Sequence, residues 1–252
     1  MLSVFFTRFY FTYKRYIEDP YYHLIKRHPE LFIGGHILDV GANICYTAHL
    51  FSQTVSNNYK VFAFEPDPIN FNVLRQVIQS KQISQRVLPF QLAIGKEKGV
   101  VEFWQKSGSH ADHRIKTHEL KSRHAIPEAQ SLQINQTSID HFALDHKIER
   151  DIKFIKIDVQ GYEPSVFAGM QTVLNHSPRL AFSIEYCPDM LIEMGFDLLE
   201  FIQKAQDLQF QVYTIGLNGA LNFISNLANF PMPKRGYIEL LLTHNKYKDD
   251  QS

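Results

Sequence analysis

The sequence predicts an open, doubly wound α/β sheet that is mostly parallel, with an antiparallel last strand. From residue 35 onward, short and continuously apolar runs alternate with helical patterns, as expected for parallel strands that are covered on both faces. A glycine turn follows the first apolar run, at residue 41. The last two runs are joined by a segment without an obvious helix, and this indicates that the final strand pairs antiparallel.

The predicted elements follow one another with short connections, which favours right-handed crossovers. The strands are the apolar runs 36–40, 59–65, 86–94, 153–159, 179–186, 210–215 and 237–243. The helices cover about 46–56, 68–80, 163–175 and 189–207. In the last of these, apolar residues recur at helical spacing: Leu191, Met194, Leu198, Leu199 and Ile202.

One segment, residues 105–130, breaks this alternation. It is polar and rich in histidine, and it follows the run "VVEFW" at 100–104. An irregular stretch of this length inside a compact domain is usually disordered or a functional lid. We therefore expect one domain over residues 35–245, with 105–130 as a lid loop, preceded by an N-terminal arm over residues 1–34.

The arm is rich in aromatic residues but is interrupted by Arg8, Lys14 and Arg15. It lacks the charged start and the clean apolar block of a signal peptide. We expect an amphipathic segment that packs on the domain or on a second subunit of a homodimer. The alternative is a helix that contacts a membrane surface, because basic and aromatic residues alternate in it.

Composition excludes some function classes. The chain has 26 basic and 26 acidic residues, so no global charge attracts a polyanion, and we expect no nucleic-acid partner. The two cysteines, Cys45 and Cys187, form no CxxC pair, which suits a reducing compartment and predicts a cytoplasmic protein. His110 and His113 form an HxxH pair, but without a nearby cluster of ligands we predict no metal site.

The glycine turn lies in "ILDVGANICYTAHLF", residues 37–51. Ligands of open α/β sheets bind beyond the carboxyl ends of the strands, and Gly41 permits close approach of a ligand there. A dinucleotide fingerprint would have three glycines, and the carboxylate of Asp39 would repel the two phosphates of NAD. S-adenosylmethionine brings an ammonium group instead. Glu65 ends the next strand, where an acid accepts hydrogen bonds from ribose hydroxyls. The loop therefore favours S-adenosylmethionine over NAD.

Six segments resemble, in sequence and in order, the FkbM family of S-adenosylmethionine-dependent methyltransferases. They are "ILDVGANICYTAHLF", "VFAFEPDPINFNVLRQVI", "LAIGKEKGVVEFW", "TSID", "IKFIKIDVQGYEPSVFAGMQTVL" and "LAFSIEY", within residues 36–187. The resemblance implies a class I methyltransferase fold, which is Rossmann-like. It also implies O-methylation of a hydroxyl group on a sugar, glycolipid or secondary metabolite.

The resemblance also implies a division of roles around the cofactor. It assigns Asp39, Gly41 and Asn43 to the methionine end of S-adenosylmethionine and Glu65 to the ribose. Ala93 falls where such folds border the adenine.

On the acceptor side, Asp158 ends the strand beside the transferable methyl group. It is our first candidate for a base or an acceptor-orienting group; the alternative is a carboxylate that only hydrogen-bonds the following turn. His113 is the second candidate, because its ordinary pKa suits proton transfer near neutrality. Asp112 and Arg114 lie beside it to orient it or to bind a polar substrate. Glu185, at the end of its strand, is expected to contact substrate.

Two residues depart from the family pattern. Cys45 stands where the family usually has a second glycine, and Gln160 stands where it normally has a glutamate. We place Gln160 on the acceptor side, where glutamine can replace a hydrogen-bonding carboxylate but not one that takes a proton. The departures keep open a catalytically weak cofactor-binding or interaction protein. An NAD-dependent oxidoreductase is a further alternative, disfavoured by the lone glycine and Asp39.

Overall fold

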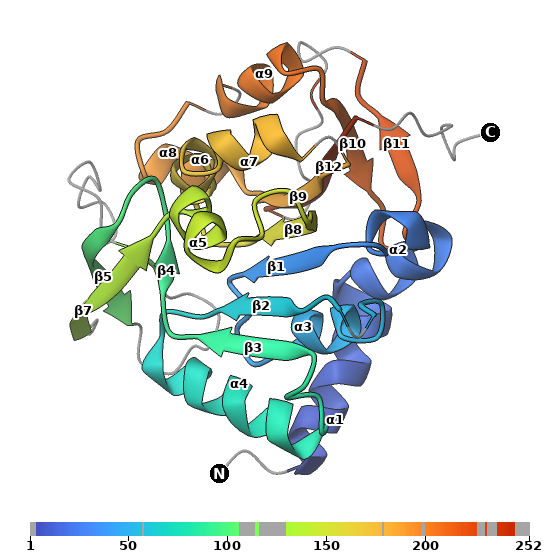
Figure 1. Cartoon of the computed structure of the whole chain (residues 1–252), viewed down its shortest axis with the longest axis vertical. Coiled ribbons are helices and arrows are strands. Elements are labelled where there is room, and N and C mark those ends of the chain that lie inside the picture. The colour runs from blue at the N-terminus through green and yellow to red at the C-terminus, as the bar shows by residue number, and fades with distance from the viewer. Residues whose placement is uncertain are drawn as a thin grey trace.

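The computed structural model describes residues 4–56, 58–105, 114–115, 130–177, 179–197, 200–225, 230 and 236–244. Its main sheet has the strand order β11-β10-β12-β9-β8-β1-β2-β3 (Figure 1). The strands are, in chain order, β1 (His36–Val40), β2 (Val61–Phe64), β3 (Val87–Phe90), β8 (Ile152–Ile157), β9 (Ala181–Tyr186), β10 (Gln211–Ile215), β11 (Leu221–Phe223) and β12 (Ile238–Thr243).

Strand directions confirm the predicted fold class. From β3 to β9 each neighbouring pair is parallel, whereas β12 pairs antiparallel with both β9 and β10. The strands between β3 and β9 are almost continuously buried, because helices cover both faces. The strand order reverses between β1 and β8, and ligands of such sheets bind at that point.

Two apolar cores lie on the two faces of the main sheet. One contains residues of α3 (Tyr46–Phe51) and α4 (Pro68–Ser80) together with the N-terminal arm. The other contains residues of five helices: α5 (Ile139–His146), α6 (Glu163–Ala168), α7 (Gln171–His176), α8 (Pro188–Glu193) and α9 (Glu200–Asp207). In α4 the side chain of Asp67 accepts hydrogen bonds from the backbone N–H groups of Ile69 and Asn70, both at 2.8 Å, which fixes the start of the helix.

The arm packs against the sheet of its own chain. It consists of α1 (Val4–Tyr13), a π-helical turn η1 (Lys14–Glu18), α2 (Tyr21–Arg27) and a 3₁₀ turn η2 (Pro29–Leu31). Tyr21 is fully buried. Its hydroxyl lies 2.7 Å from the Ser183 hydroxyl and donates to a carboxylate oxygen of Glu239 at 3.1 Å. Strands β9 and β12 are therefore tied to the arm by buried hydrogen bonds.

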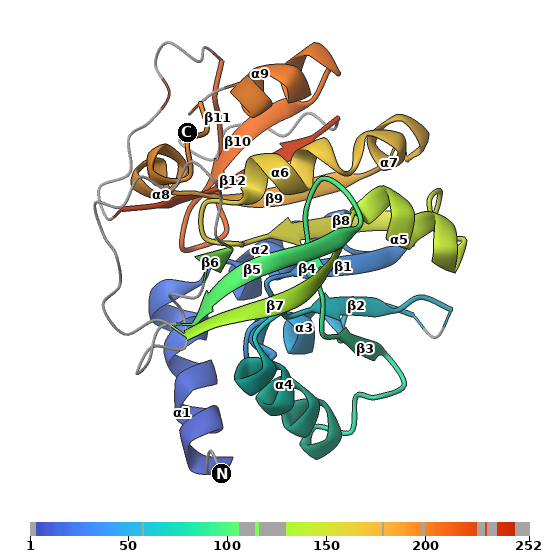
Figure 2. The same cartoon turned by 90° about the vertical axis from the view of Figure 1, so that its left-hand side faces the viewer.

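A second sheet, which the sequence analysis did not predict, lies beyond the carboxyl ends of β1–β3. Its strands, in the order β4-β7-β5-β6, are β4 (Ala93–Ile94), β7 (Gln130–Thr137), β5 (Gly99–Gln105) and β6 (Arg114–Ile115). Figure 1 shows β5 and β7 at the side toward which β1–β3 point, and Figure 2 shows them in front of the main sheet. The expected single strand 86–94 is thus two strands, one in each sheet. The sequence pattern hid this sheet because β5 and β7 mix exposed polar and apolar positions.

Two predicted helices are each divided in two. The segment 163–175 breaks at Gly169, where an added Cβ would lie 2.2 Å from the carbonyl oxygen of Gly95. The Gly169 carbonyl accepts from the Asp140 N–H at 2.9 Å, at the start of α5. In the segment 189–207, α8 ends before Gly195, which has φ +80°. Among the described residues, no helix combines the length and apolar character needed to span a bilayer.

Candidate functional site

A cavity of ≈ 450 Å³ opens at the carboxyl ends of β1, β2 and β8, where the strand order reverses. Its wall is built by the loop after β1, the end of β2, the second sheet, the loop after β8, the end of β9 and the arm. The volume is within the range of about 300–1,000 Å³ that small-molecule sites occupy. The position and size both indicate a ligand site.

Glu65 stands at one side of this cavity with its carboxylate held by the backbone. One oxygen accepts from the Asn43 N–H at 2.8 Å and the other from the Asp67 N–H at 2.9 Å. Burial raises the pKa of Glu65 to about 8 despite these hydrogen bonds. Each carboxylate oxygen has a second lone pair, so the group can also accept from a ligand hydroxyl. Beside it, Ala93 lines the cavity together with Phe64 and Leu92, a surface suited to an apolar ring.

The loop after β1 has an unusual backbone. Gly41, Asn43 and Cys45 all have positive φ, at +79°, +47° and +84°. An added Cβ on Gly41 would lie 1.8 Å from the Asp158 carbonyl oxygen, so only glycine fits at this position. Cys45 adopts the left-handed conformation, which glycine adopts without strain. Asn43 lines the cavity, and its buried Oδ1 has no hydrogen-bond partner within the described parts of the chain.

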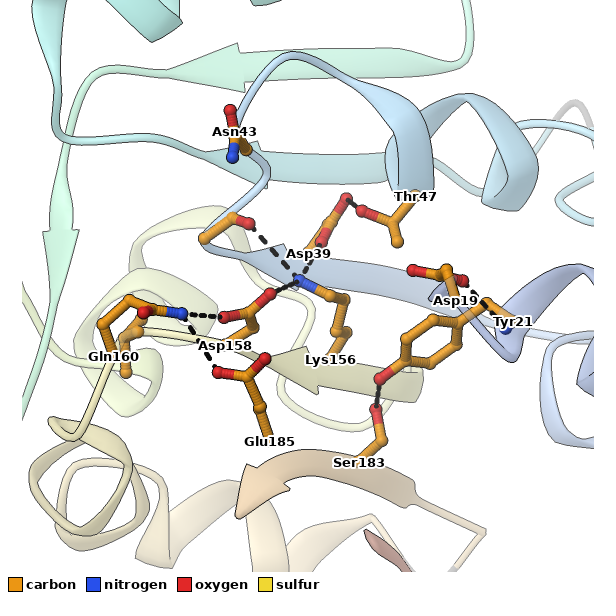
Figure 3. Close-up of polar contacts among 12 residues, drawn as sticks. Asp19, Tyr21, Asp39, Asn43, Thr47, Lys156, Asp158, Gln160, Ser183 and Glu185 are labelled. Atoms are coloured by element: carbon orange, nitrogen blue, oxygen red, sulfur yellow. Dashed lines mark hydrogen bonds and ion pairs between the residues drawn. The ribbon is translucent and has the colours of Figure 1, made fainter. Parts of the chain in front are cut away.

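Asp39 lies beneath this loop and has no exposed surface. It accepts from the Thr47 hydroxyl at 2.7 Å, and its other oxygen is 3.7 Å from the Lys156 ammonium nitrogen (Figure 3). Burial raises the pKa of Asp39, although Lys156 and Thr47 oppose that rise. The structure therefore places Asp39 under the cavity floor and not on its wall. Any charge that disfavours phosphates must come from an ionised acid that does line the cavity, and Asp158 is the first of these.

Lys156, which the sequence analysis did not single out, joins the ends of β1 and β8. It donates to the Asp158 carboxylate at 3.1 Å and to the Gly41 carbonyl at 3.3 Å. Burial alone would lower the pKa of Lys156, but Asp158 and Asp39 raise it overall. Lys156 therefore stays charged and compensates two carboxylates. Its signal in the sequence is a basic residue within the otherwise apolar run "FIKI".

Asp158 faces the cavity, as the sequence analysis expects, and is held on both sides. One oxygen bonds Lys156, and the other accepts from the Gln160 amide at 3.0 Å (Figure 3). Although burial favours the neutral acid, the charges of Lys156 and Lys14 hold the pKa of Asp158 below its usual range. A carboxylate of low basicity accepts a hydrogen bond well and takes a proton poorly. The geometry thus favours an orienting role for Asp158 over that of a general base.

Gln160 bridges two acids. Its amide nitrogen donates to Asp158 and also to Glu185 Oε2, each at 3.0 Å. Burial and then the charges of Asp158 and Glu239 raise the pKa of Glu185 well above its usual value. Glu239 stands directly opposite Glu185 in the β9–β12 pair. The glutamine therefore supplies donors where a third carboxylate would meet two others.

The arm contributes a further wall that the sequence analysis missed. Tyr10, Lys14 and Glu18, spaced four residues apart, all line the cavity. The Lys14 ammonium donates to Glu18 at 2.6 Å. These residues lie in and beside the π-helical turn, which is closed by a hydrogen bond from the Asp19 N–H to the Lys14 carbonyl at 2.9 Å. Such turns are frequent at functional sites. Only the spacing of the three residues could have indicated their shared face.

The proposed lid falls largely outside the described residues, and so do Asp112 and His113. Of Arg114 the structure describes the backbone, which pairs with Trp104 of β5. The next residue, Ile115, is buried and lines the cavity. Strand β6 therefore begins at Arg114 itself, and its second residue lines the cavity. Their roles stay predictions.

Comparisons with known proteins agree with this geometry. A family model described as "Methyltransferase FkbM domain" matches residues 39–230. An FkbM methyltransferase from Methylobacillus flagellatus KT is 17% identical with a TM-score of 0.51, over 92% of this chain and 50% of that protein. A putative rRNA-methylase from Clostridium thermocellum is 10% identical with a TM-score of 0.52, over 90% of this chain and 96% of the other. No curated protein matches.

At these identities the two structures show likeness of fold alone. The chain spans about half the length of the Methylobacillus protein. The family match begins at residue 39, so the arm residues that line the cavity lie outside it.

Proposed function

Because the chain belongs to the FkbM methyltransferase family, we propose that it transfers a methyl group from S-adenosylmethionine to a hydroxyl oxygen. The acceptor class that the family resemblance favours is a sugar, a glycolipid or a secondary metabolite. The observation that carries the proposal is the cavity at the strand-order reversal, with Glu65 at one side and the Asp158–Gln160–Glu185 cluster at another.

The residues of the cavity fit this cofactor. Glu65 accepts from the ribose hydroxyls with the lone pairs that the backbone leaves free, and the Asn43 side-chain oxygen accepts from a ligand donor such as an ammonium group. Gly41 lets the backbone approach the methionine portion, and Ala93 borders the adenine. The bound cofactor supplies an electrophilic methyl group on a sulfonium sulfur.

On the acceptor side, alignment is the main requirement of an in-line displacement. Asp158 accepts a hydrogen bond from the acceptor hydroxyl and so orients the acceptor oxygen for methyl transfer. Lys156 and Gln160 keep that carboxylate fixed and charged. The proton itself needs a more basic group than Asp158, and His113, with Asp112 and Arg114 beside it, stays the sequence-based candidate.

The alternatives differ in what they bind and turn over. A catalytically weak interaction protein would bind S-adenosylmethionine without transfer. An NAD-dependent oxidoreductase would need to seat two phosphates near Glu65 and Asp158, and the lone glycine of the loop provides no fingerprint for them.

Transfer of a radiolabelled methyl group to a panel of sugars, glycolipids and hydroxylated metabolites tests the proposal. We expect transfer to at least one acceptor, with His113→Ala lowering turnover by about 10²-fold and S-adenosylhomocysteine affinity staying within about twofold. Cofactor binding without transfer to any acceptor would favour the interaction protein. Binding of NAD in preference to S-adenosylhomocysteine would refute the proposal.

A further inference from the structure

The arm carries an apolar stripe that faces solvent. Phe9, Tyr13, Tyr16 and Ile17 follow helical spacing (i, i+4, i+7, i+8) and are between 41% and 74% exposed. A different face of the same helical segment, which includes Lys14, lines the cavity. The segment is therefore held in place by a partly polar face while an aromatic face meets water. A surface helix of a globular domain usually has the reverse arrangement.

Cations border this stripe. The Arg15 guanidinium lies 4.3 Å from the centre of the Tyr22 ring, and that ring lies 6.0 Å from the ring of Tyr16. The Lys26 ammonium lies 4.4 Å from the same Tyr22 ring. Lys26 and Arg27 are both exposed. Positive charge is thus gathered along one side of the exposed aromatic residues.

The acids of the same segment are turned away from the stripe. Glu18 lines the cavity and pairs with Lys14 at 2.6 Å. Asp19 accepts from the Tyr21 backbone N–H at 2.9 Å, at the start of α2. The chain as a whole has a formal net charge of +0, so the excess of positive charge beside the stripe is local to the arm. It arises because Glu18 and Asp19 have partners away from the stripe, whereas Arg15 and Lys26 lie against the Tyr22 ring beside it.

We propose that this outer arm face, made of Phe9, Tyr13, Tyr16 and Ile17, bordered by Arg15 and Lys26 and followed in α2 by the exposed Arg27, docks onto an anionic phospholipid surface. Tyrosine and apolar side chains enter the headgroup boundary, and the bordering cations meet the lipid phosphates. A second copy of the chain fits less well, because a twofold interface would bring the same cations of both subunits together. The proposal does not depend on methyl transfer.

Cosedimentation with lipid vesicles tests the proposal. The full chain should bind phosphatidylcholine vesicles that contain about 30% phosphatidylglycerol, bind pure phosphatidylcholine weakly, and be released by salt. The variant Phe9→Ser/Tyr16→Ser/Ile17→Ser should lose at least about tenfold in affinity. The variant Lys26→Gln/Arg27→Gln should lose about fivefold per neutralised charge.

A matched control removes exposed apolar side chains elsewhere. Leu144 and Ile192 are 65% and 60% exposed on α5 and α8, and Leu144→Ser/Ile192→Ser should bind vesicles like the wild type. All variants should keep the wild-type Tm, because every changed side chain is exposed. The proposal would be overturned if the wild-type chain did not bind anionic vesicles, or if an arm variant bound them with the affinity of the wild type. A wild-type dimer that the arm variant converts to a monomer would overturn it too, and would assign the face to a second copy.

Discussion

Gln160→Glu puts a carboxylate between Asp158 and Glu185, and its effect on stability should depend on pH. In the wild type the amide donates to both acids at 3.0 Å, and the hydrogen bond to the ionised Asp158 contributes about 1.5–3 kcal/mol. A neutral carboxyl in its place keeps one donor. An ionised carboxyl keeps none and adds a like charge beside two acids.

The direction of the pKa shift decides whether the variant loses more stability at low pH or at high pH. Burial and the neighbouring acids raise the folded pKa of the introduced carboxyl above its unfolded value of about 4.3. Its penalty is therefore small below about pH 4, grows with pH, and levels off above the folded pKa. For a rise of about two pH units in that pKa, the variant loses about 2.5 kcal/mol more at pH 8 than at pH 4.

Urea unfolding followed by circular dichroism measures this difference, with Gln160→Met as the control. Methionine removes the same hydrogen bonds without adding a charge, so its penalty should vary less with pH. Glutamine, glutamate and methionine are all unbranched at Cβ, so the wild type and both variants bear the same cost of the backbone angle φ +57° at this position. If the gap between the two variants is the same at pH 5 and pH 8, the reasoning about the acidic cluster is wrong.

Three further outcomes follow from the site. Lys156→Met should lower the free energy of unfolding by about 3–5 kcal/mol, because it leaves Asp39 buried and uncompensated. The control Lys204→Met, which removes an exposed 2.6 Å ion pair, should lower it by less than about 1 kcal/mol in the same denaturation assay. Equal losses in the two variants would contradict this prediction. Cys45→Ala should be less stable than Cys45→Gly by about 1 kcal/mol, because only glycine adopts the backbone angle φ +84° of this position without strain. The opposite order of stability in thermal melts would show that the backbone is not strained at Cys45. Binding of S-adenosylhomocysteine at pH 7 should release a proton from Glu65, whose pKa is about 8 without ligand, so the affinity should rise with pH up to about pH 8. Calorimetry in buffers of different ionisation enthalpy measures this proton release. If no proton is released, Glu65 does not bind the ribose as an ionised carboxylate.

Much of the main sheet could be predicted because buried parallel strands leave a local signal. Runs such as "VFAF" at 61–64 are apolar over several consecutive residues, and the antiparallel β12 followed from the missing crossover helix. The second sheet left no such signal, because buried, half-buried and exposed positions follow no fixed period in β5 and most residues of β7 are polar. Helix α5 was also missed, although Ser138 caps it by accepting from the His141 N–H.

The site was predictable where it lies at strand ends and not where it depends on distant contacts. Glu65 and Asp158 follow apolar strands, and the ends of such strands meet at one edge of the sheet. Asp39 has the same local pattern, yet the structure buries it under the loop, because Lys156 on the neighbouring strand compensates it. The approach of Lys14 to the cavity joins segments more than a hundred residues apart, and no local pattern encodes that.

The measurement that tests the central claim most directly is calorimetric titration of S-adenosylhomocysteine into the wild type and Glu65→Ala. The cavity at the ends of β1, β2 and β8 should bind this ligand, and NAD should bind far more weakly. Loss of the backbone-held carboxylate should weaken binding by about 1–3 kcal/mol. The control Glu30→Ala removes an acid that is 53% exposed in the arm and should bind like the wild type. Equal affinity of Glu65→Ala and the wild type would contradict the account of the cofactor site.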